Sequence, residues 1–342
     1  MTSSATARAI VYSGTGGPEV LRLVDKPLQA PPPGHVRVRI VRSGVNPTDW
    51  KSRAGSGTPA PVDPPQVPGQ DGAGIIDDIG AGVDVERVGQ RVWLWEAAWQ
   101  RPEGTTQDFA VVPAQQAVPL PDSASFDLGA GLGIPFLTAH RCLTVTEDGP
   151  THLGPGALTG RTVFVAGGAG AVGNAAIQLA RWADATVLTS VSSPDKAQLA
   201  AAAGADHVIN YREQDVAAEV RKIVPAGVNT VVEVSPARNA SIDTAILAPN
   251  GSIAIYANDG GSELTLPVRD SMAPNIRWQF VLVYTAPREA KERAVRAVSA
   301  ALAAGAIRPV LPQHHFPLDQ AGAAHQAVQD SVVGKVLIDV AD

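Results

Sequence analysis

A glycine-rich loop is the first feature of the sequence that could do chemistry. Gly168, Gly170 and Gly173 form the pattern G-x-G-x-x-G, which follows an apolar run at 162–166 and opens a helical pattern. These glycines permit a tight turn, so that free N–H groups and the positive end of the helix face a pyrophosphate. A second apolar run at 186–190 stands where the motif requires it. The loop predicts dinucleotide binding; the alternative is a turn that only lets a helix pack on a strand.

The end of the second run distinguishes the two nicotinamide dinucleotides. An acidic residue there would accept hydrogen bonds from the ribose 2′-hydroxyl of NAD. The sequence instead places Ser192, Ser193 and Lys196 there, and hydroxyls with an ammonium suit a 2′-phosphate. We therefore predict NADPH, with Tyr211 near the adenine. In the alternative, Ser193 caps a helix that begins at Pro194 and Lys196 is solvated, and both can hold together.

Hydrophobic patterning predicts the elements that position this loop. Beyond residue 160, short apolar runs alternate with helical patterns, which indicates a parallel sheet covered on both faces. The first third alternates β-rich runs with Gly and Pro turns, which indicates an antiparallel β domain. A helix is predicted at 126–143, another at 288–304, and a strand at 277–284.

Composition excludes several classes of protein. A chain of 342 residues corresponds to roughly two domains. Hydrophobic residues make up 45% and the net charge is only -6, which disfavours disorder. The 27 basic residues are scattered among 33 acidic ones, which argues against a nucleic-acid partner. The single Cys142 allows no internal disulfide, and no apolar run is long enough for a membrane span, so we expect a cytoplasmic protein without a membrane partner.

A series of short motifs, in fixed order, resembles the medium-chain dehydrogenase/reductase superfamily, in its zinc-free quinone oxidoreductase (zeta-crystallin-like) branch. The resemblance covers nearly the whole chain. The motifs are G-V-N-P-T-D at 44–49, P-G-Q-D-G-A-G at 68–74, G-Q-R-V at 89–92, L-T-A at 137–139, the loop at 166–173, G-A-D at 204–206, N-G at 250–251 and G-K at 334–335.

The resemblance implies an α/β fold: a Rossmann-type doubly wound parallel sheet plus a GroES-like β-barrel catalytic domain. We place the catalytic domain at 1–126 and 286–342, and the Rossmann NADP-binding domain at 127–285. The resemblance further implies an active site in the cleft between the domains. It also implies a homodimer, which relatives form through the strand at 277–284.

Zinc-dependent members of the superfamily carry a Cys at the position of Asn46, a His at Gln70, and a Cys or acid near Ile134. Here these positions hold amides and an aliphatic side chain, which are poor zinc ligands. We predict no metal site and exclude a zinc alcohol dehydrogenase. The pair His314 and His315 has no further ligands nearby in sequence.

The remaining chemistry is hydride transfer from NADPH to an electron-poor acceptor, with negative charge developing on a carbonyl oxygen. The resemblance places Asn46 near the nicotinamide ribose and the substrate oxygen, and Thr138 beside the nicotinamide. The residues from Asn46 to Arg53 match the variant N-P-x-D-x-K-x-R, which looks like that of enzymes reducing α,β-unsaturated carbonyls.

Lys51 within this variant could place a cation near an enolate oxygen or donate the proton. The alternative is a solvated lysine paired with Asp49 or Asp71. Trp93 and Trp95, with Trp99, lie where relatives line the substrate mouth, although the spacing of the first two fits a core role equally well.

The sequence thus predicts an NADPH-dependent, zinc-independent oxidoreductase that reduces quinones or α,β-unsaturated carbonyl compounds. The alternatives are a pathway-specific enoyl reductase of secondary metabolism and a non-catalytic NADPH-binding protein. The predicted catalytic residues are Asn46, Lys51 and Thr138. The predicted cofactor contacts are Asn46, Thr138, Gly168, Gly170, Ala171, Val172, Gly173, Ser192, Ser193, Lys196, Tyr211, Tyr256 and Lys335.

Overall fold

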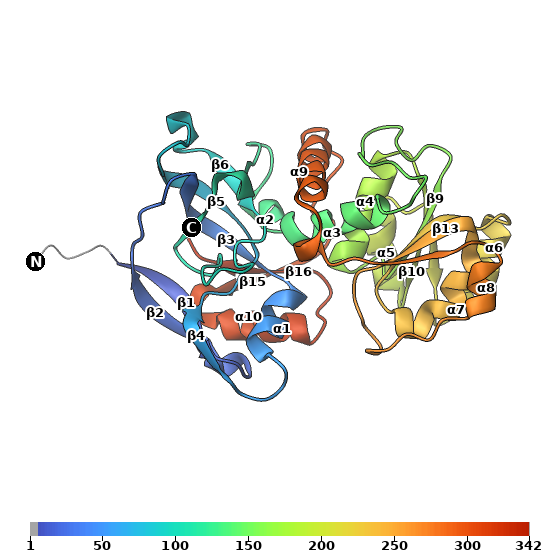
Figure 1. Ribbon diagram of the computed structural model, residues 1–342, viewed down its shortest axis with the longest axis horizontal. Helices are drawn as coiled ribbons and strands as arrows, with labels where there is room; N and C mark the ends of the chain where they lie inside the picture. Colours follow the sequence, from blue (N-terminus) through green and yellow to red (C-terminus); the bar gives the residue numbers. More distant parts are fainter. Residues whose placement is uncertain (1–5, 342) are drawn as a thin grey trace, which may run out of the picture. The chain divides into compact units, whose positions relative to one another are not determined.

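The chain divides into two compact units in a computed structural model that describes residues 6–341 (Figure 1). Unit 1 takes the chain up to Ile134 together with the segment from Pro312 onward, and unit 2 is Pro135–Leu311. The sequence prediction ended the second domain at residue 285. In the structure helix α9 (Arg288–Ala303) belongs to unit 2, because it packs on helix α4 (Ala171–Trp182).

Unit 1 is built on a seven-stranded, mainly antiparallel sheet in the order β15-β16-β3-β5-β6-β8, with β7 paired to β3. A smaller sheet has the order β2-β1-β4. The strands are β1 (Thr6–Gly14), β2 (Arg22–Pro27), β3 (His35–Val45), β4 (Pro61–Gln66), β5 (Asp71–Ile79), β6 (Arg91–Leu94), β7 (Phe109–Pro113), β8 (Ala117–Pro119), β15 (Gln313–Pro317) and β16 (Lys335–Asp339). Along β3 the alternate residues Val36, Val38 and Ile40 are fully buried, as expected of a strand with one face on the core.

Helix α1 (Pro47–Ala54) begins directly after β3 and packs against α10 (Ala321–Gln329). Asn46 is its N-cap, and the side chain of Asp49 in the first turn accepts the backbone N–H of Asn46 at 2.7 Å. The cap fixes Asn46 at the end of a central strand, where its side chain lies buried.

The helix predicted at 126–143 is two helices, α2 (Phe126–Gly129) and α3 (Gly133–Leu143). The break is caused by a tertiary contact, since a Cβ atom at Gly133 would lie 2.1 Å from Oδ1 of Asp71. Asp71 occupies this space and accepts the N–H of Ile134, in the first turn of α3. The interruption therefore brings the start of α3 against β5.

Unit 2 holds a six-stranded parallel sheet in the order β11-β10-β9-β12-β13-β14, which is the doubly wound arrangement predicted from the sequence. The strands are β9 (Thr162–Ala166), β10 (Thr186–Val191), β11 (His207–Asn210), β12 (Val228–Glu233), β13 (Leu247–Ile255) and β14 (Arg277–Phe280). The remaining helices are α5 (Pro194–Ala203), α6 (Val216–Ile223), α7 (Pro236–Ile246) and α8 (Val268–Met272).

The strand predicted at 277–284 is shorter in the structure. It ends at Phe280 because its partner β13 ends at Ile255, whose carbonyl accepts the last ladder bond from Val281 N at 2.7 Å. The chain then turns into a short 3-10 helix, Val283–Thr285.

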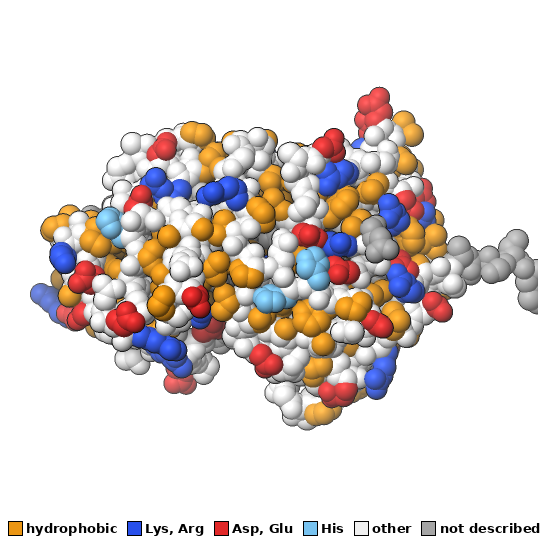
Figure 2. Space-filling view, turned by 180° about the vertical axis from the view of Figure 1, so that it is seen from behind, with side chains coloured by type: hydrophobic (Ala, Val, Ile, Leu, Met, Phe, Trp, Pro, Cys, Tyr) orange, Lys and Arg blue, Asp and Glu red, His pale blue; other side chains and the backbone are white. Residues whose placement is uncertain are grey.

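Among residues 6–341, no helix combines the length and the apolar character that a membrane span needs. On the face seen in Figure 2, Lys and Arg side chains are interspersed with Asp and Glu.

Candidate functional site

The glycine-rich loop in unit 2 connects the central strand β9 to helix α4. Gly167 has φ 71, and the N–H groups of Gly167 and Gly168 both donate to the carbonyl of Ser190. Gly170 is the N-cap of α4, and no side chain caps this helix end. The first N–H groups of a helix have no partner within it. The start of α4 is therefore suited to bind an anion.

The three motif glycines are needed for different reasons. A Cβ at Gly168 would lie 2.2 Å from Oγ1 of Thr189, and one at Gly173 would lie 2.3 Å from the carbonyl oxygen of Gly167. Both glycines are therefore required by packing within the protein. A Cβ at Gly170 would meet nothing closer than 3.4 Å, an ordinary contact. The alternative of a purely structural turn explains Gly168 and Gly173 but leaves Gly170 without a packing reason.

Ser192, Ser193 and Lys196 lie together at the end of β10. Oγ of Ser193 accepts the backbone N–H of Lys196 at 3.4 Å and caps α5, so the cap of that alternative is confirmed, although not its solvated lysine. Nζ of Lys196 donates to Oγ of Ser192 at 3.0 Å, and the lysine is half-buried. One hydroxyl and one ammonium thus lie within a hydrogen bond of each other, as a 2′-phosphate site needs.

A pocket of about 490 Å³ lies at the carboxyl ends of β9, β10 and β12. Its size is within the range of small-molecule sites. Of the predicted cofactor contacts, which all lie within residues 6–341, Tyr211 alone lines it and is 52% exposed; the pocket touches the glycine loop at Gly167 and β10 at Ser190. Sequence reasoning missed Arg238, Asn239 and Asp243, which line the pocket from α7. The only sequence feature that could have indicated them is the helix that follows the carboxyl end of a parallel strand.

A buried polar cluster forms in unit 1 around Asn46. Its Nδ2 donates to Oδ2 of Asp71 at 2.7 Å, and its Oδ1 accepts from Nζ of Lys335 at 2.9 Å. Lys335 also donates to the carbonyl of Val45 at 3.1 Å, and the N–H of Ile134 donates to both oxygens of Asp71. These bonds fix which end of the Asn46 amide carries nitrogen and which carries oxygen.

Asp49 is the second buried carboxyl of the cluster. It accepts the N–H of Asn46 at 2.7 Å and the N–H of Gln70 at 3.2 Å. Burial raises the pKa of Asp49 to about 7 and that of Asp71 to about 6, although the charge of Lys335 opposes both shifts. Burial also lowers the pKa of Lys335, against the pull of the two carboxylates.

The cluster has a definite chemical capacity. An amide NH₂ group has two N–H donors, and at Asn46 one of them is bound to Asp71. The second is available for an oxygen on which negative charge develops, and fixed donors of this kind stabilise such charge. The sequence predicted Asn46 and Lys335 separately as cofactor contacts; the structure shows that they are bonded to each other. Asp71 was missed as their partner, and its signal was an acid within a glycine-rich motif.

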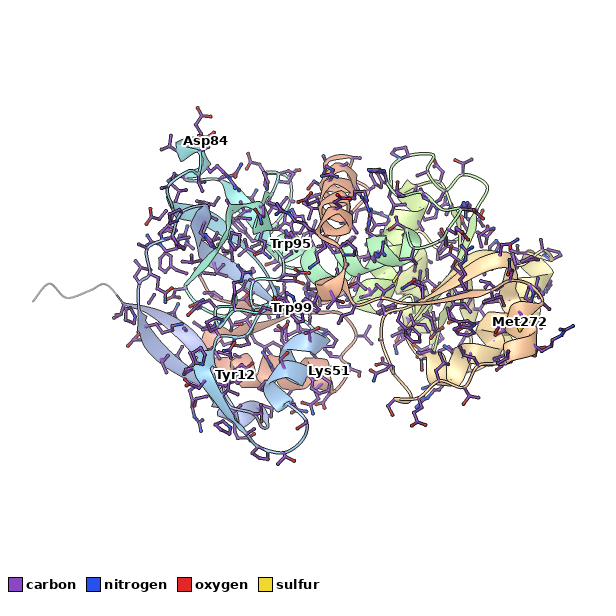
Figure 3. The ribbon with its side chains drawn as sticks, in the orientation of Figure 1. Tyr12, Lys51, Asp84, Trp95, Trp99 and Met272 are labelled. Atoms are coloured by element: carbon purple, nitrogen blue, oxygen red, sulfur yellow. The ribbon has the colours of Figure 1, made fainter. Side chains whose placement is uncertain are left out.

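Lys51 is exposed on α1, where its Nζ lies 5.8 Å from the ring centroid of Trp50 (Figure 3). Within residues 6–341 it forms no ion pair with Asp49 or Asp71, so the predicted pairing is wrong, whereas its exposure agrees with the solvated alternative. Thr138 is buried on α3, 6% exposed.

The three tryptophans of unit 1 differ in their exposure. Trp93 and Trp95 are 0% and 7% exposed, which fits the core role, whereas Trp99 is half-buried (Figure 3).

Comparison with known proteins gives family matches in both units. A model described as alcohol dehydrogenase GroES-like domain matches residues 32–122, and one described as zinc-binding dehydrogenase matches residues 171–300. The quinone oxidoreductase of Rattus norvegicus is 30% identical, over 98% of this chain and 99% of its own length.

Two solved structures resemble the whole chain. A mycobacterial protein solved in complex with NADPH has a TM-score of 0.81 and 29% identity, covering 97% of this chain and 99% of that one. A structure titled as an NAD-dependent alcohol dehydrogenase has a TM-score of 0.83 and 28% identity, covering 98% of this chain and 100% of that one. From its uncapped glycine loop, its GroES-like unit and its full-length relatives, the chain belongs to the quinone oxidoreductase branch of the medium-chain dehydrogenase/reductase superfamily and is an oxidoreductase.

Proposed function

We propose that the protein is an NADPH-dependent, zinc-independent oxidoreductase that reduces quinones or α,β-unsaturated carbonyl compounds. The observation that supports the proposal is the glycine loop, in which Gly170 stands at the uncapped start of α4 and a Cβ would meet nothing closer than 3.4 Å. A pyrophosphate fits such a site. Ser192 and Lys196 favour the 2′-phosphorylated dinucleotide.

In the proposed mechanism, bound NADPH supplies the hydride. The Asn46 amide donates its free N–H to the substrate carbonyl oxygen and stabilises the charge that develops there. Lys335 and Asp71 hold the amide in this orientation. Thr138 would contact the nicotinamide. Lys51, exposed in solvent, is the proposed donor of the proton that completes the reduction.

The donor set around Asn46 supports the absence of zinc from this reaction. An amide, a second amide at Gln70 and the aliphatic Ile134 are poor zinc ligands. The ammonium of Lys335 already lies 2.9 Å from Oδ1 of Asn46. A metal ion at this place would have to sit beside a buried cation, which costs free energy.

The experiment that tests the function is oxidation of NADPH and of NADH by the purified protein, followed by nicotinamide absorbance. A simple quinone, an alkyl enone and a reaction without acceptor are compared. Turnover that needs both NADPH and an acceptor supports the proposal. Tight NADPH binding with no turnover on either acceptor contradicts it and favours a dedicated substrate or a binding role.

Lys196→Met is expected to raise the KM for NADPH by about tenfold to a hundredfold, because one charge-assisted bond to the 2′-phosphate is lost. The KM for NADH is expected to stay unchanged, since NADH carries no such phosphate. Lys196→Arg, which keeps the charge, serves as the control and retains most of the affinity. An equal effect of Lys196→Met on both cofactors would assign the lysine to α5 stability alone.

We also propose a homodimer formed through the edge strand β14. The exposed edge of a sheet is a ready template for pairing with another chain. Large apolar side chains are exposed on and around this strand, and Met272 lies at the outer edge of its unit (Figure 3). They are Val268, Met272, Phe280 and Leu282, each between 54% and 69% exposed.

Phe280→Asp is expected to convert the dimer to a monomer, because it places a charge in an apolar interface. Light scattering coupled to size-exclusion chromatography measures the mass. Val85→Asp, at a site 72% exposed on unit 1, is the matched control and leaves the mass unchanged. A wild-type mass of one chain would refute the dimer.

A further inference from the structure

Two carboxyl groups face each other inside unit 2. Glu233 is the last residue of β12 and Asp243 lies on α7, and both side chains are fully buried. The two carboxyl groups interact, and Oε2 of Glu233 and both oxygens of Asp243 are buried without a hydrogen-bond partner among the described residues. Within residues 6–341, neither forms an ion pair with a Lys, Arg or His.

The hydrogen-bond donors around the two carboxyls indicate which of them holds the proton. Oε1 of Glu233 accepts the backbone N–H of Ser235 and, at 3.0 Å, Nδ2 of Asn239. These donors favour the ionised form at Glu233. Oε2 of Glu233 and both oxygens of Asp243 receive no N–H or hydroxyl donor from another side chain or from the backbone. Two buried carboxylates in contact would repel, so Asp243 holds a proton and donates it to Glu233.

The pair lies at the wall of the pocket described above. Asp243, Asn239 and Ser235 all line this pocket, and Asn239 and Ser235 are the donors to Glu233. The acid pair thus fastens the turn between β12 and α7 at the same residues that a ligand in the pocket would contact.

We propose that Glu233 and Asp243 share one proton and are positioning residues for the dinucleotide, whose affinity falls when that proton is lost. The proposal rests on the proposed function only in naming NADPH as the ligand. Loss of the proton removes one of the interactions between α7 and the strand end, next to the bond from Asn239. It also adds a second negative charge to a wall that faces an anionic ligand.

Burial and nearby charges determine how the affinity for the dinucleotide changes with pH. Burial raises the pKa of both carboxyls, and the charge of Glu233 raises the pKa of Asp243 further. The pair therefore keeps its proton to a higher pH than two isolated carboxyls would. The charged and titratable groups that face it or the pocket are Arg238 on α7, Asp215 at the start of α6, Tyr211 after β11, and Tyr256 and Asp259 after β13.

The test compares the wild type with Asp243→Asn, which keeps the shape and an N–H donor toward Glu233 but has no proton to lose. The Kd for NADPH is measured from about pH 6 to about pH 10. The wild-type Kd is expected to rise by up to about tenfold per pH unit once the pair ionises. The variant lacks this rise. Titration of the 2′-phosphate is common to both proteins and cancels in the comparison.

Unfolding without any ligand separates this inference from the proposed function. An acid whose folded pKa is raised loses stability as pH rises from its unfolded toward its folded pKa. The Tm of Asp243→Asn, minus that of the wild type, is therefore expected to increase with pH. Glu233→Gln, which leaves a single acid in the pair, is expected to show the same trend. It keeps the test valid if Asp243→Asn does not fold.

The outcomes distinguish the shared proton, its role for the dinucleotide and the proposed function. A Tm difference that does not change with pH overturns the shared proton. A Tm difference that grows with pH, combined with parallel Kd profiles, keeps the shared proton but overturns its role for the dinucleotide. Absence of NADPH binding at every pH, with the Tm trend intact, contradicts the proposed function instead.

Discussion

Lys335→Met is expected to lower kcat by about a hundredfold or more while changing the KM for NADPH by less than about threefold. Methionine fills nearly the same volume but donates no hydrogen bond. Oδ1 of Asn46 would lose its partner at 2.9 Å, and Asp71 would lose the cation that opposes its burial. The amide would then no longer be held with its N–H toward the substrate oxygen, and removal of one such donor typically costs two to three orders of magnitude in rate.

Steady-state kinetics with the acceptor preferred by the wild type make this measurement. Lys222→Met serves as the matched control, because Lys222 is 77% exposed on α6 and its weak ion pair with Glu219 contributes little. The opposite pattern, a large rise in KM for NADPH with kcat unchanged, would make Lys335 a cofactor contact. That pattern would support the role assigned to it from sequence and reject the positioning role.

The pH dependence of stability gives a second readout for the same variant. The charge of Lys335 lowers the pKa of Asp71, which burial has raised to about 6. Without that charge the pKa of Asp71 rises further. A buried acid with a raised folded pKa contributes stability that is present at low pH and lost as pH rises through that pKa. The variant is therefore expected to match the wild type more closely at about pH 5 than at about pH 8, in denaturant unfolding.

Local sequence signals predicted the elements of unit 2 well, because its chemistry lies close together along the chain. The strand, the glycine loop and helix α4 are contiguous, and Ser193 caps the helix that starts at the next residue. The helix break near Gly133 was not predicted, since its cause is Asp71, far away in sequence. The two domain boundaries also differ, because packing of α9 on α4 leaves no local signal.

The polar clusters show more clearly that tertiary contacts leave no local signal in the sequence. Asn46 and Lys335 are bonded although 289 residues separate them, so sequence alone could name both but not join them. Asp243 carries no motif at all, and although α7 follows β12 directly in the chain, nothing in the sequence indicates that this side chain meets Glu233. Residues that act through a motif are visible in the sequence, whereas those that act by holding a motif residue are visible only in the fold.

Gly170→Ala is expected to weaken NADPH binding by about tenfold to a hundredfold while leaving the free energy of unfolding nearly unchanged. The backbone at Gly170 has φ -79 and ψ 161, which alanine adopts without strain, and its Cβ would have an ordinary contact at 3.4 Å. The apo fold therefore tolerates the methyl group. A pyrophosphate that approaches this backbone does not, because the methyl group occupies the place of its oxygens.

Gly173→Ala is the informative contrast to this variant. A Cβ there would lie 2.3 Å from a backbone oxygen, so Gly173→Ala is expected to lower the Tm as well as cofactor affinity. Calorimetric titration with NADPH and thermal unfolding of both variants separate the effect on the ligand from the effect on the fold. Wild-type affinity in a folded Gly170→Ala protein would show that the dinucleotide does not bind over this glycine. The open space at the start of α4 would then need another occupant, and the proposed cofactor role of the loop would be wrong.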